Sequence, residues 1–339
     1  MKILEEVLSA CVSSAKSEPI KLVEHKRDFM LHSQLHVMMT MPSGSFKSTI
    51  LKSIPKKTFV DIQDYTLPAL VGSIGQNGLV KGYVMKAAGK CLPVDEFHSL
   101  DEKARKALLS LTEDQKATRL FGYDSRMSEK KSGRYLKYRI DGNEIHIDYV
   151  RCSVLLSGIY APHKRRDASP DDFAFSSRFL PVTLKPTFEE LDDVMMGKRK
   201  ILEIKYLPYS EAPVFEDFNK FVVAYRETIK NLPRRVCDFF LMNTEFYNRL
   251  KLHFAKFFAW KNRNNSTIED WEKYLPYIPY FAYSTIASTL TFGEFEIYDL
   301  LCRGMKQQEI AEKLQCSKQY ISKIVKNLRI IGLIGDDLG

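Results

Sequence analysis

The sequence of 339 residues lacks the cysteine patterns of disulfide-rich and zinc-binding proteins. It has six cysteines but no C-x-x-C pair, and no histidine lies at metal-ligand spacing from any of them. We therefore expect reduced thiols, mostly in the core of an intracellular protein. The six are Cys11, Cys91, Cys152, Cys237, Cys302 and Cys316.

Long apolar runs are also missing. No window approaches the roughly 20 uninterrupted apolar residues that a membrane-spanning helix needs. The N-terminal segment 1–25 carries acidic side chains inside its apolar part and contains no secretory h-region. Solenoid repeats and low-complexity segments are absent from the sequence too. These absences predict a globular cytoplasmic protein without membrane contact.

Acidic residues are the minority charge, with 42 Asp and Glu against 51 Lys and Arg, which gives a formal net charge of +9. Such a charge favours polyanions, either nucleic acid or an acidic membrane surface, but basicity of this size alone selects no function. The hydrophobic content of 45% is ordinary for a globular protein, and the length suffices for two or three packed units.

Short apolar runs dominate the first half of the chain. The runs LHVMMT (35–40), KTFVDI (57–62), KCLPVDEF (90–97), CSVLLSGIYAP (152–162) and RFLPVTL (178–184) are typical of strands buried on both faces of a parallel sheet. Later segments are helical and aromatic in character. We predict an N-terminal helix or tail (1–20), an α/β core with a mainly parallel sheet (21–195), a helical unit (196–290) and a short C-terminal unit (291–339).

The stretch HVMMTMPSGSFKST (36–49) has the outline of a phosphate-binding loop. In such a loop, backbone N–H groups at a helix start surround the phosphate, a lysine neutralises charge and a hydroxyl holds Mg²⁺. Two glycines of the G-x-x-x-x-G-K-[ST] pattern are replaced here by Met41 and Phe46. Alone, the stretch fits a plain strand-turn-helix equally well. The candidate nucleotide-binding residues are Ser43, Gly44, Ser45, Lys47, Ser48 and Thr49.

A second stretch, GKCLPVDEFHSL (89–100), runs from an apolar strand into Asp95 and Glu96. An aspartate at this point can hold Mg²⁺, and a glutamate can polarise the water that attacks a phosphate. The alternative is an acidic pair that caps the helix beginning in SLDEKARKALLSL. A K-[ST] loop followed about fifty residues later by this strand is a joint signal, and it favours the nucleotide site.

The order of these segments resembles the minichromosome maintenance (MCM) class of AAA+ ATPases. Residues 70–120, which include LVGSIGQNGLVKGYVMKAAGKCLPVDEF, are similar to the family's helix-2 insertion, its Walker B strand and the following helix. CSVLLSGIYAP is similar to the sensor-1 strand, and FAFSSRFLPVTLKPTFEELDD (173–193) resembles the segment with the arginine finger. The resemblance covers about residues 35–193, with a looser trace of the lid helix at YNRLKLHFAK (247–256).

This resemblance implies a P-loop ATPase core with a helical lid, which binds ATP and Mg²⁺. By position in the motifs, Lys47 and Ser48 would bind phosphate and metal, Asp95 would hold the metal, and Glu96 would be the catalytic base. Arg178 would reach the ATP of a neighbouring subunit in trans, which implies a homo-oligomeric ring such as a hexamer. The alternative for Arg178 is a surface arginine before an edge strand.

Several family features have no counterpart in the sequence. The sensor-1 asparagine is replaced, and Ser157 is the nearest polar candidate. No sensor-2 arginine aligns, and the family's N-terminal oligonucleotide-binding domain and zinc module are missing. These departures leave open the rate of hydrolysis and the way DNA is held. They suit a small replication protein encoded by a virus or plasmid of an archaeon.

The stretch RYLKYRIDGNEIHI (134–147) alternates around Asp141-Gly142, which is typical of a β-hairpin, and the basic run EKKSGR overlaps its start. In the MCM-like class a hairpin at this point contacts the DNA backbone in the ring channel. The alternative is a solvated charged loop. We predict phosphate contacts by Lys130, Lys131 and Arg134, and as second choices by Lys137, Tyr138 and Arg139.

The C-terminal stretch KQQEIAEKLQCSKQYISKIVKNLRIIGLIG (306–335) has the pattern of a helix-turn-helix, with Ser317 as the N-cap of the second helix. FGEFEIYDLLCRG (292–304) predicts the preceding helix, and RIIGLIGDD (329–337) predicts a wing. Such units contact either DNA or proteins. The predicted buried positions are Ile310, Ala311, Leu314, Cys316, Ile321 and Ile324. The predicted DNA contacts are Ser317, Lys318, Gln319, Tyr320, Ser322 and Lys323.

Two functions follow as expectations. The first is an ATP-driven, ring-forming DNA helicase or translocase of replication, which acts on single- and double-stranded DNA and works with replication partner proteins. The second is an ATP-regulated initiator, loader or transcription regulator that binds DNA through its C-terminal unit and hydrolyses ATP slowly or not at all. A transposition ATPase that coats DNA is a third, weaker expectation.

Overall fold

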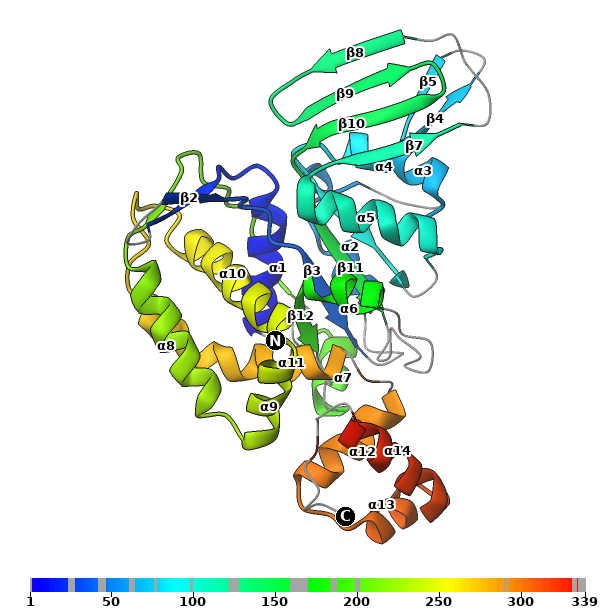
Figure 1. Ribbon diagram of the computed structural model, residues 1–339, viewed down its shortest axis with the longest axis vertical. Helices are drawn as coiled ribbons and strands as arrows, with labels where there is room; N and C mark the ends of the chain where they lie inside the picture. The colour runs from blue at the N-terminus through cyan, green and yellow to red at the C-terminus, as the bar shows by residue number, and fades with distance from the viewer. Residues whose placement is uncertain are drawn as a thin grey trace.

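The computed structural model describes residues 2–23, 28–41, 47–60, 65–75, 78–97, 100–121, 128–158, 170–183, 188–198, 202–288, 290, 292–330 and 334. Among the described residues, a four-stranded all-parallel sheet, two antiparallel sheets, a mixed three-stranded sheet (β13-β1-β2) and a helical C-terminal region make up a mixed α/β fold (Figure 1). The strands are β1 (Ile20–Val23), β2 (Asp28–Leu31), β3 (Val37–Thr40), β4 (Gly72–Gly75), β5 (Gly78–Lys81), β6 (Cys91–Val94), β7 (Ala117–Leu120), β8 (Ser128–Ser132), β9 (Leu136–Asp141), β10 (Glu144–Val150), β11 (Ser153–Gly158), β12 (Leu180–Thr183) and β13 (Val214–Phe215).

The helices cover the sheets and form the C-terminal region. They are α1 (Lys2–Ser14), α2 (Lys47–Lys52), α3 (Leu67–Val71), α4 (Tyr83–Lys86), α5 (Glu102–Asp114), α6 (Pro170–Ser177), α7 (Phe188–Met195), α8 (Phe218–Lys230), α9 (Arg234–Met242), α10 (Thr244–Lys261), α11 (Ile278–Ser288), α12 (Phe292–Cys302), α13 (Gln307–Lys313) and α14 (Lys318–Ile330), with 3-10 helices η1 (Lys56–Thr58) and η4 (Trp271–Tyr277). None of the described helices is both long and apolar enough to cross a membrane.

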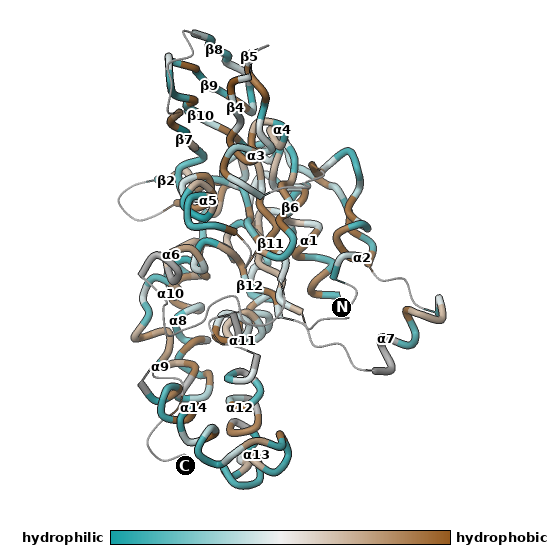
Figure 2. The backbone as a smooth tube through the Cα atoms, turned by 90° about the vertical axis from the view of Figure 1, so that its right-hand side faces the viewer, coloured by the Kyte–Doolittle hydropathy of each residue, from teal (hydrophilic) through white to brown (hydrophobic). Residues whose placement is uncertain are grey.

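The parallel sheet has the strand order β12-β3-β11-β6. Four predicted apolar runs supply its strands, and almost every residue in them is buried, as strands covered on both faces require. The hydrophobic residues run through its centre in Figure 2. Proline cannot donate to a strand ladder, and Pro93 and Pro181 lie in the two outer strands. The fifth predicted run contributes only a parallel bridge from Phe59 to Cys91 in the described part of the chain.

A four-stranded antiparallel sheet, β7-β10-β9-β8, lies at one end of the molecule (Figure 1). Its strands β9 and β10 form the hairpin that the sequence predicts, and Gly142 in the turn has φ 55°, a left-handed conformation that glycine adopts readily. A second hairpin, β4 and β5, stands beside this sheet. Between β6 and β11, the chain therefore forms a β layer, β7 to β10, that is separate from the parallel sheet.

An aromatic core joins the helical region to the N-terminus. Phe221, Phe254 and Phe258 are buried, and the Phe221 and Phe258 rings meet edge to face at 5.3 Å. Helix α1 packs against α10, β11 and β3. Residues 2–14 thus form a structural helix with a mostly buried surface, and the alternative expectation of a tail is wrong for them. The predicted boundary at residue 196 does not separate two independent cores.

A ladder of serines ties α1 and the turn after it to the extended segment 202–209. Backbone N–H groups of Lys205, Leu207 and Tyr209 donate to the side-chain oxygens of Ser9, Ser13 and Ser17, at 2.9, 2.8 and 3.3 Å. From Ser9 to Ser13, four residues of helix advance about 6 Å, as two residues of extended chain do, so these two spacings match. The ladder satisfies backbone groups that have no strand partner of their own.

The C-terminal region is a three-helix unit in which α12, α13 and α14 contact one another. It lies at the end of the molecule opposite the antiparallel sheet (Figure 1). Ile310, Ala311, Ile321 and Ile324 are buried as predicted, while Leu314 and Cys316 are half-buried. Ser317 caps α14 by accepting a hydrogen bond from the N–H of Tyr320 at 3.2 Å. The predicted wing lies almost entirely outside the described residues.

Candidate functional site

Three strands of the parallel sheet bring the predicted nucleotide-site residues together. In a parallel sheet the carboxyl ends of the strands meet at one edge, where ligands of open α/β sheets bind. Lys47 follows β3, Asp95 and Glu96 follow β6, and Ser157 lies near the end of β11. Because β11 lies between β3 and β6, Ser157 can stand between the lysine and the acidic pair.

The side chains at this edge contact one another directly. The ammonium of Lys47 forms an ion pair with the Glu96 carboxylate and lies 3.7 Å from Oδ1 of Asp95. Ser157 donates to Oδ1 of Asp95 at 2.5 Å, and Ser48 donates to Oδ2 at a longer 3.4 Å. Residues 47, 48, 95, 96 and 157 thus form one polar cluster, which we call the carboxyl-edge site. Thr49 is exposed beside it.

The turn that carries the acidic pair has an unusual backbone. Glu96 has φ 51°, a left-handed conformation that is uncommon for residues other than glycine. Its N–H donates to Oδ1 of Asp95 at 3.0 Å, and the N–H of Asp95 donates to the hydroxyl of Tyr65 at 2.9 Å. Strained backbone conformations of this kind concentrate at functional sites. Sequence reasoning missed Tyr65, since no pattern connects it to a strand thirty residues later.

Close packing holds the acidic turn against β11. A side-chain carbon added to Gly158 would lie 2.6 Å from the ring of Phe97, nearer than real atoms approach. Phe97 directly follows Glu96 and is buried. Glycine at the end of β11 therefore lets the aromatic ring sit on the strand backbone. The contact sets the position of Glu96 relative to Ser157.

The structure contradicts the alternative interpretation of Asp95 and Glu96 as a helix cap. Helix α5 begins at Glu102, and its N-cap is Asp101, whose carboxylate accepts from the N–H of Ala104 at 2.6 Å. The acidic pair therefore does not cap this helix. Its partners are Lys47, Ser48 and Ser157.

The loop before Lys47 is only partly described. Ser43, Gly44, Ser45 and Phe46 lie outside the described residues, so the candidate nucleotide contacts at 43–45 stay predictions. Met41, which replaces the first glycine of the pattern, is buried in the core, and its N–H donates to the carbonyl of Gly158 at 3.1 Å. Its side chain is thus part of the hydrophobic core.

The oxygen atoms of the carboxyl-edge site suit a hard cation. Mg²⁺ prefers oxygen ligands and takes one or two protein groups together with water and substrate phosphates. Asp95 and Ser48 offer such oxygens, so these residues fit the metal. Within the described ranges no group of three or more His, Cys, Asp and Glu side chains could hold a metal ion.

Arg178 lies at the opposite edge of the sheet. It precedes β12, and the neighbouring N–H of Leu180 donates to the carbonyl of His36, which precedes β3. Arg178 is only 8% exposed, which removes the alternative of a surface arginine. Its guanidinium pairs with Glu245 at 2.5 Å and with Glu113 at 2.8 Å within the same chain. A role in trans stays a prediction, and it requires Arg178 to leave these partners.

Two exposed basic surfaces lie at the two ends of the molecule. On the antiparallel sheet, Lys130 and Lys131 of β8 are exposed, while Arg134 is exposed and pairs with Glu18 at 2.9 Å. Of the second choices, Lys137 and Arg139 are exposed. Tyr138 is buried and donates to Glu129, so it is not placed to contact DNA.

On the C-terminal unit, the first turns of α14 present polar side chains to solvent. All the predicted contacts there are exposed: Ser317, Lys318, Gln319, Tyr320, Ser322 and Lys323. Burial of Ile321 and Ile324 on the other face fixes this orientation.

Comparison of the chain with models of known protein families finds no match, and comparison with curated proteins finds no match either. The function therefore has to be argued from the geometry of these sites.

Proposed function

We propose that the protein is an ATP-hydrolysing, ring-forming DNA translocase or helicase of the MCM-like AAA+ type. The observation that carries the proposal is the carboxyl-edge site, where Lys47, Ser48, Asp95, Glu96 and Ser157 meet from three strands. Each residue was expected there from its own motif. A plain strand-turn-helix would not gather a lysine, a hydroxyl and two carboxylates at one sheet edge.

In the proposed reaction, Lys47 binds the terminal phosphates of ATP and gives up its ion pair with Glu96. The released Glu96 carboxylate then orients a water and accepts its proton as a general base, while the water oxygen bonds to the γ-phosphorus and the bond from this phosphorus to the leaving ADP oxygen breaks. Asp95 and Ser48 would hold Mg²⁺, which would supply positive charge next to the phosphate oxygens. Ser157 keeps the Asp95 carboxylate in place through its hydrogen bond.

Binding of DNA would use the two basic surfaces. Lys130 and Lys131 on the antiparallel sheet offer phosphate contacts that follow a backbone of any sequence. The exposed residues of α14 offer donors to phosphates and to base edges of a duplex. A motor that follows single strands and a module that finds duplex DNA are thereby combined in one chain.

ATP hydrolysis by the purified full chain, with and without single-stranded DNA, tests the proposal. We expect hydrolysis that DNA stimulates, a fall of about 100-fold or more in Glu96→Gln with ATP binding retained, and loss of ATP binding in Lys47→Ala. Lys230→Met, an exposed lysine on α8, is the control. A wild-type protein without DNA-stimulated hydrolysis and without strand displacement would exclude the motor.

A second candidate function is a DNA-binding initiator or regulator in which ATP acts as a slow switch. Two observations favour it: Lys47 is paired with Glu96, and Arg178 is buried and paired within its own chain. Both residues would have to change partners before turnover. A Lys47→Ala protein that still binds a specific duplex with wild-type affinity, while the wild type shows no unwinding, would select this function.

A further inference from the structure

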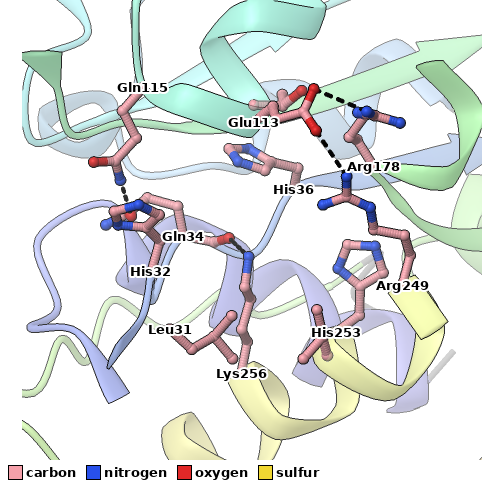
Figure 3. Close-up of a pocket in the computed structure, with 12 residues that line it drawn as sticks. Leu31, His32, Gln34, His36, Glu113, Gln115, Arg178, Arg249, His253 and Lys256 are labelled. Carbon is pink, nitrogen blue, oxygen red and sulfur yellow. Dashed lines mark hydrogen bonds and ion pairs between the residues drawn. The ribbon is translucent and has the colours of Figure 1, made fainter. Parts of the chain in front are cut away.

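A pocket lies at the amino-terminal edge of the parallel sheet, away from the carboxyl-edge site. It is formed by the segment before β3, the end of α5, Arg178 before β12, and α10. Figure 3 shows Arg249, His253 and Lys256 of α10 facing Gln34, His36 and Glu113 across it. The pocket does not use any residue of the carboxyl-edge site.

Cations outnumber anions around this pocket. Arg178, Arg249 and Lys256 line it, and Glu113 is the one carboxylate among its lining residues in the described part of the chain. Glu113 is shared, because its two oxygens accept from Arg178 at 2.8 Å and from Arg249 at 2.9 Å. Lys256 instead donates to the backbone carbonyl of Gln34 at 2.8 Å, a neutral partner. Arg178 also pairs with Glu245 at 2.5 Å, so among the described ion pairs Lys256 is the lining cation that has no carboxylate partner.

Burial shifts the pKa values of three lining residues most strongly, and repulsion between neighbouring cations adds to the shifts. Burial, followed by the charge of Arg249, lowers the pKa of Lys256 to about 7. Burial, followed by the charge of Lys256, lowers the pKa of His253 to about 3 and that of His36 well below its usual value. Both histidines are neutral near pH 7 as a result. A negative charge in the pocket would relieve the repulsion that acts on Lys256.

Several buried polar atoms of the lining residues also have no hydrogen-bond partner among the described residues. The Nε2–H of His253 donates to the carbonyl of Ser177 at 3.1 Å, so its Nδ1 in the neutral ring is an acceptor. Within the described residues, this Nδ1, the Nε–H donor of Arg178 and the Oε1 acceptor of Gln115 have no hydrogen-bond partner, and all three residues are at most 8% exposed. Buried polar groups of this kind normally have partners. A ligand that fits them must both donate and accept.

We propose that this amino-edge pocket binds inorganic phosphate in its hydrogen-bearing forms. Phosphate near neutral pH carries negative charge for Arg178, Arg249 and Lys256, and it keeps an O–H that can donate to an acceptor such as Nδ1 of His253. Sulfate offers acceptors alone. The cavity volume of about 80 Å³ holds a group of a few heavy atoms, well below what a nucleotide needs. The proposal does not rest on hydrolysis at the carboxyl-edge site.

Calorimetric titration of the full chain with sodium phosphate at pH 7 tests the proposal, with sodium sulfate at matched ionic strength as a second titrant. We expect saturable phosphate binding and at least tenfold weaker sulfate binding. Lys256→Met and Arg249→Gln should each weaken phosphate binding about tenfold or more, the loss of one charge-assisted hydrogen bond. Lys230→Met should bind as the wild type does.

The proposal is overturned if the wild type does not bind phosphate, if sulfate binds equally well, or if both pocket variants bind phosphate as the wild type does. Lys47→Ala shows at which edge of the sheet phosphate binds. This variant should keep phosphate binding at the amino-edge pocket even if it no longer binds ATP. Loss of phosphate binding in Lys47→Ala alone would place the anion at the carboxyl-edge site. Glycerol phosphate is the test for an esterified ligand, and tighter binding of this ester would exclude free phosphate as the ligand. Circular dichroism confirms the fold of each variant.

Discussion

At the scale of single residues, the sequence predicts a functional side chain where its motif lies within a few neighbouring positions. Lys47 follows a strand-loop signature and Asp95 ends an apolar strand, so both could be found from a few neighbouring letters. Tyr65 has no such signature. It acts through a hydrogen bond to a backbone group thirty positions away, and only the folded chain brings the two together.

Tyr65→Phe tests whether this hydroxyl positions the acidic turn. The N–H of Asp95 loses its acceptor, which should lower the free energy of unfolding by about 1 kcal/mol. Because the turn also carries Glu96, we expect kcat for ATP to fall about tenfold or more while the Kd for ATP changes little. Steady-state kinetics and nucleotide titration measure both quantities.

The matched control is Tyr135→Phe, which removes a hydroxyl from a half-buried tyrosine on the β8–β9 turn. Its kinetics without DNA should equal those of the wild type. If Tyr65→Phe keeps the wild-type kcat, Tyr65 is a packing residue and the turn is held by other contacts.

At the scale of elements, apolar runs identified the strands of the parallel sheet, because burial on both faces leaves a run without polar gaps. The extended segment 202–209 was not predictable in this way. Within the described part of the chain it pairs with no strand, and its backbone N–H groups are bound by serines of α1 and of the turn that follows α1. The regular spacing of Ser9, Ser13 and Ser17 is visible in the sequence, but the segment that they bind is not.

Ser13→Ala tests this serine ladder. Its hydroxyl accepts from the N–H of Leu207 at 2.8 Å and donates to the carbonyl of Lys205 at 3.3 Å. Removing it leaves both backbone groups without that partner, so the free energy of unfolding should fall by about 1–3 kcal/mol. Urea denaturation followed by circular dichroism measures the change.

Ser322→Ala, at an exposed position of α14, is the control and should change stability by less than about 0.5 kcal/mol. Equal stability of the two variants would mean that segment 202–209 is held by its hydrophobic side chains and not by the ladder.

At the scale of the whole molecule, the two edges of one sheet carry two different sites. The carboxyl-edge site was predicted from motifs, whereas the amino-edge pocket was not, since its residues come from four segments without a shared pattern. Arg178 belongs to the second edge. It is therefore absent from its own chain's carboxyl-edge site, which a role across a subunit boundary also requires.

Mixing two inactive variants tests that role. Glu96→Gln keeps Arg178 but lacks the proposed base, and Arg178→Gln keeps the base but lacks the arginine. Each alone should hydrolyse ATP about 100-fold or more slowly than the wild type. In a mixed ring, a Glu96→Gln subunit would supply its arginine to the intact site of its neighbour, so we expect partial recovery of the rate.

The rate of the mixture is compared with the sum of the two separate rates, and native mass measurement with a non-hydrolysed ATP analogue checks that rings form. Rates that only add, in a sample that does form rings, would show that Arg178 does not act in trans.

The contacts of helix α1 also affect how the chain folds during its synthesis. The first helix packs on β3, which follows it closely in the chain, and also on β11 and on α10, where Lys261 pairs with Glu6 at 2.9 Å. During synthesis the part of its surface that α10 covers stays exposed until about three quarters of the chain has left the ribosome. The nascent protein therefore depends on chaperones for longer than a chain whose first helix packs on its immediate successor.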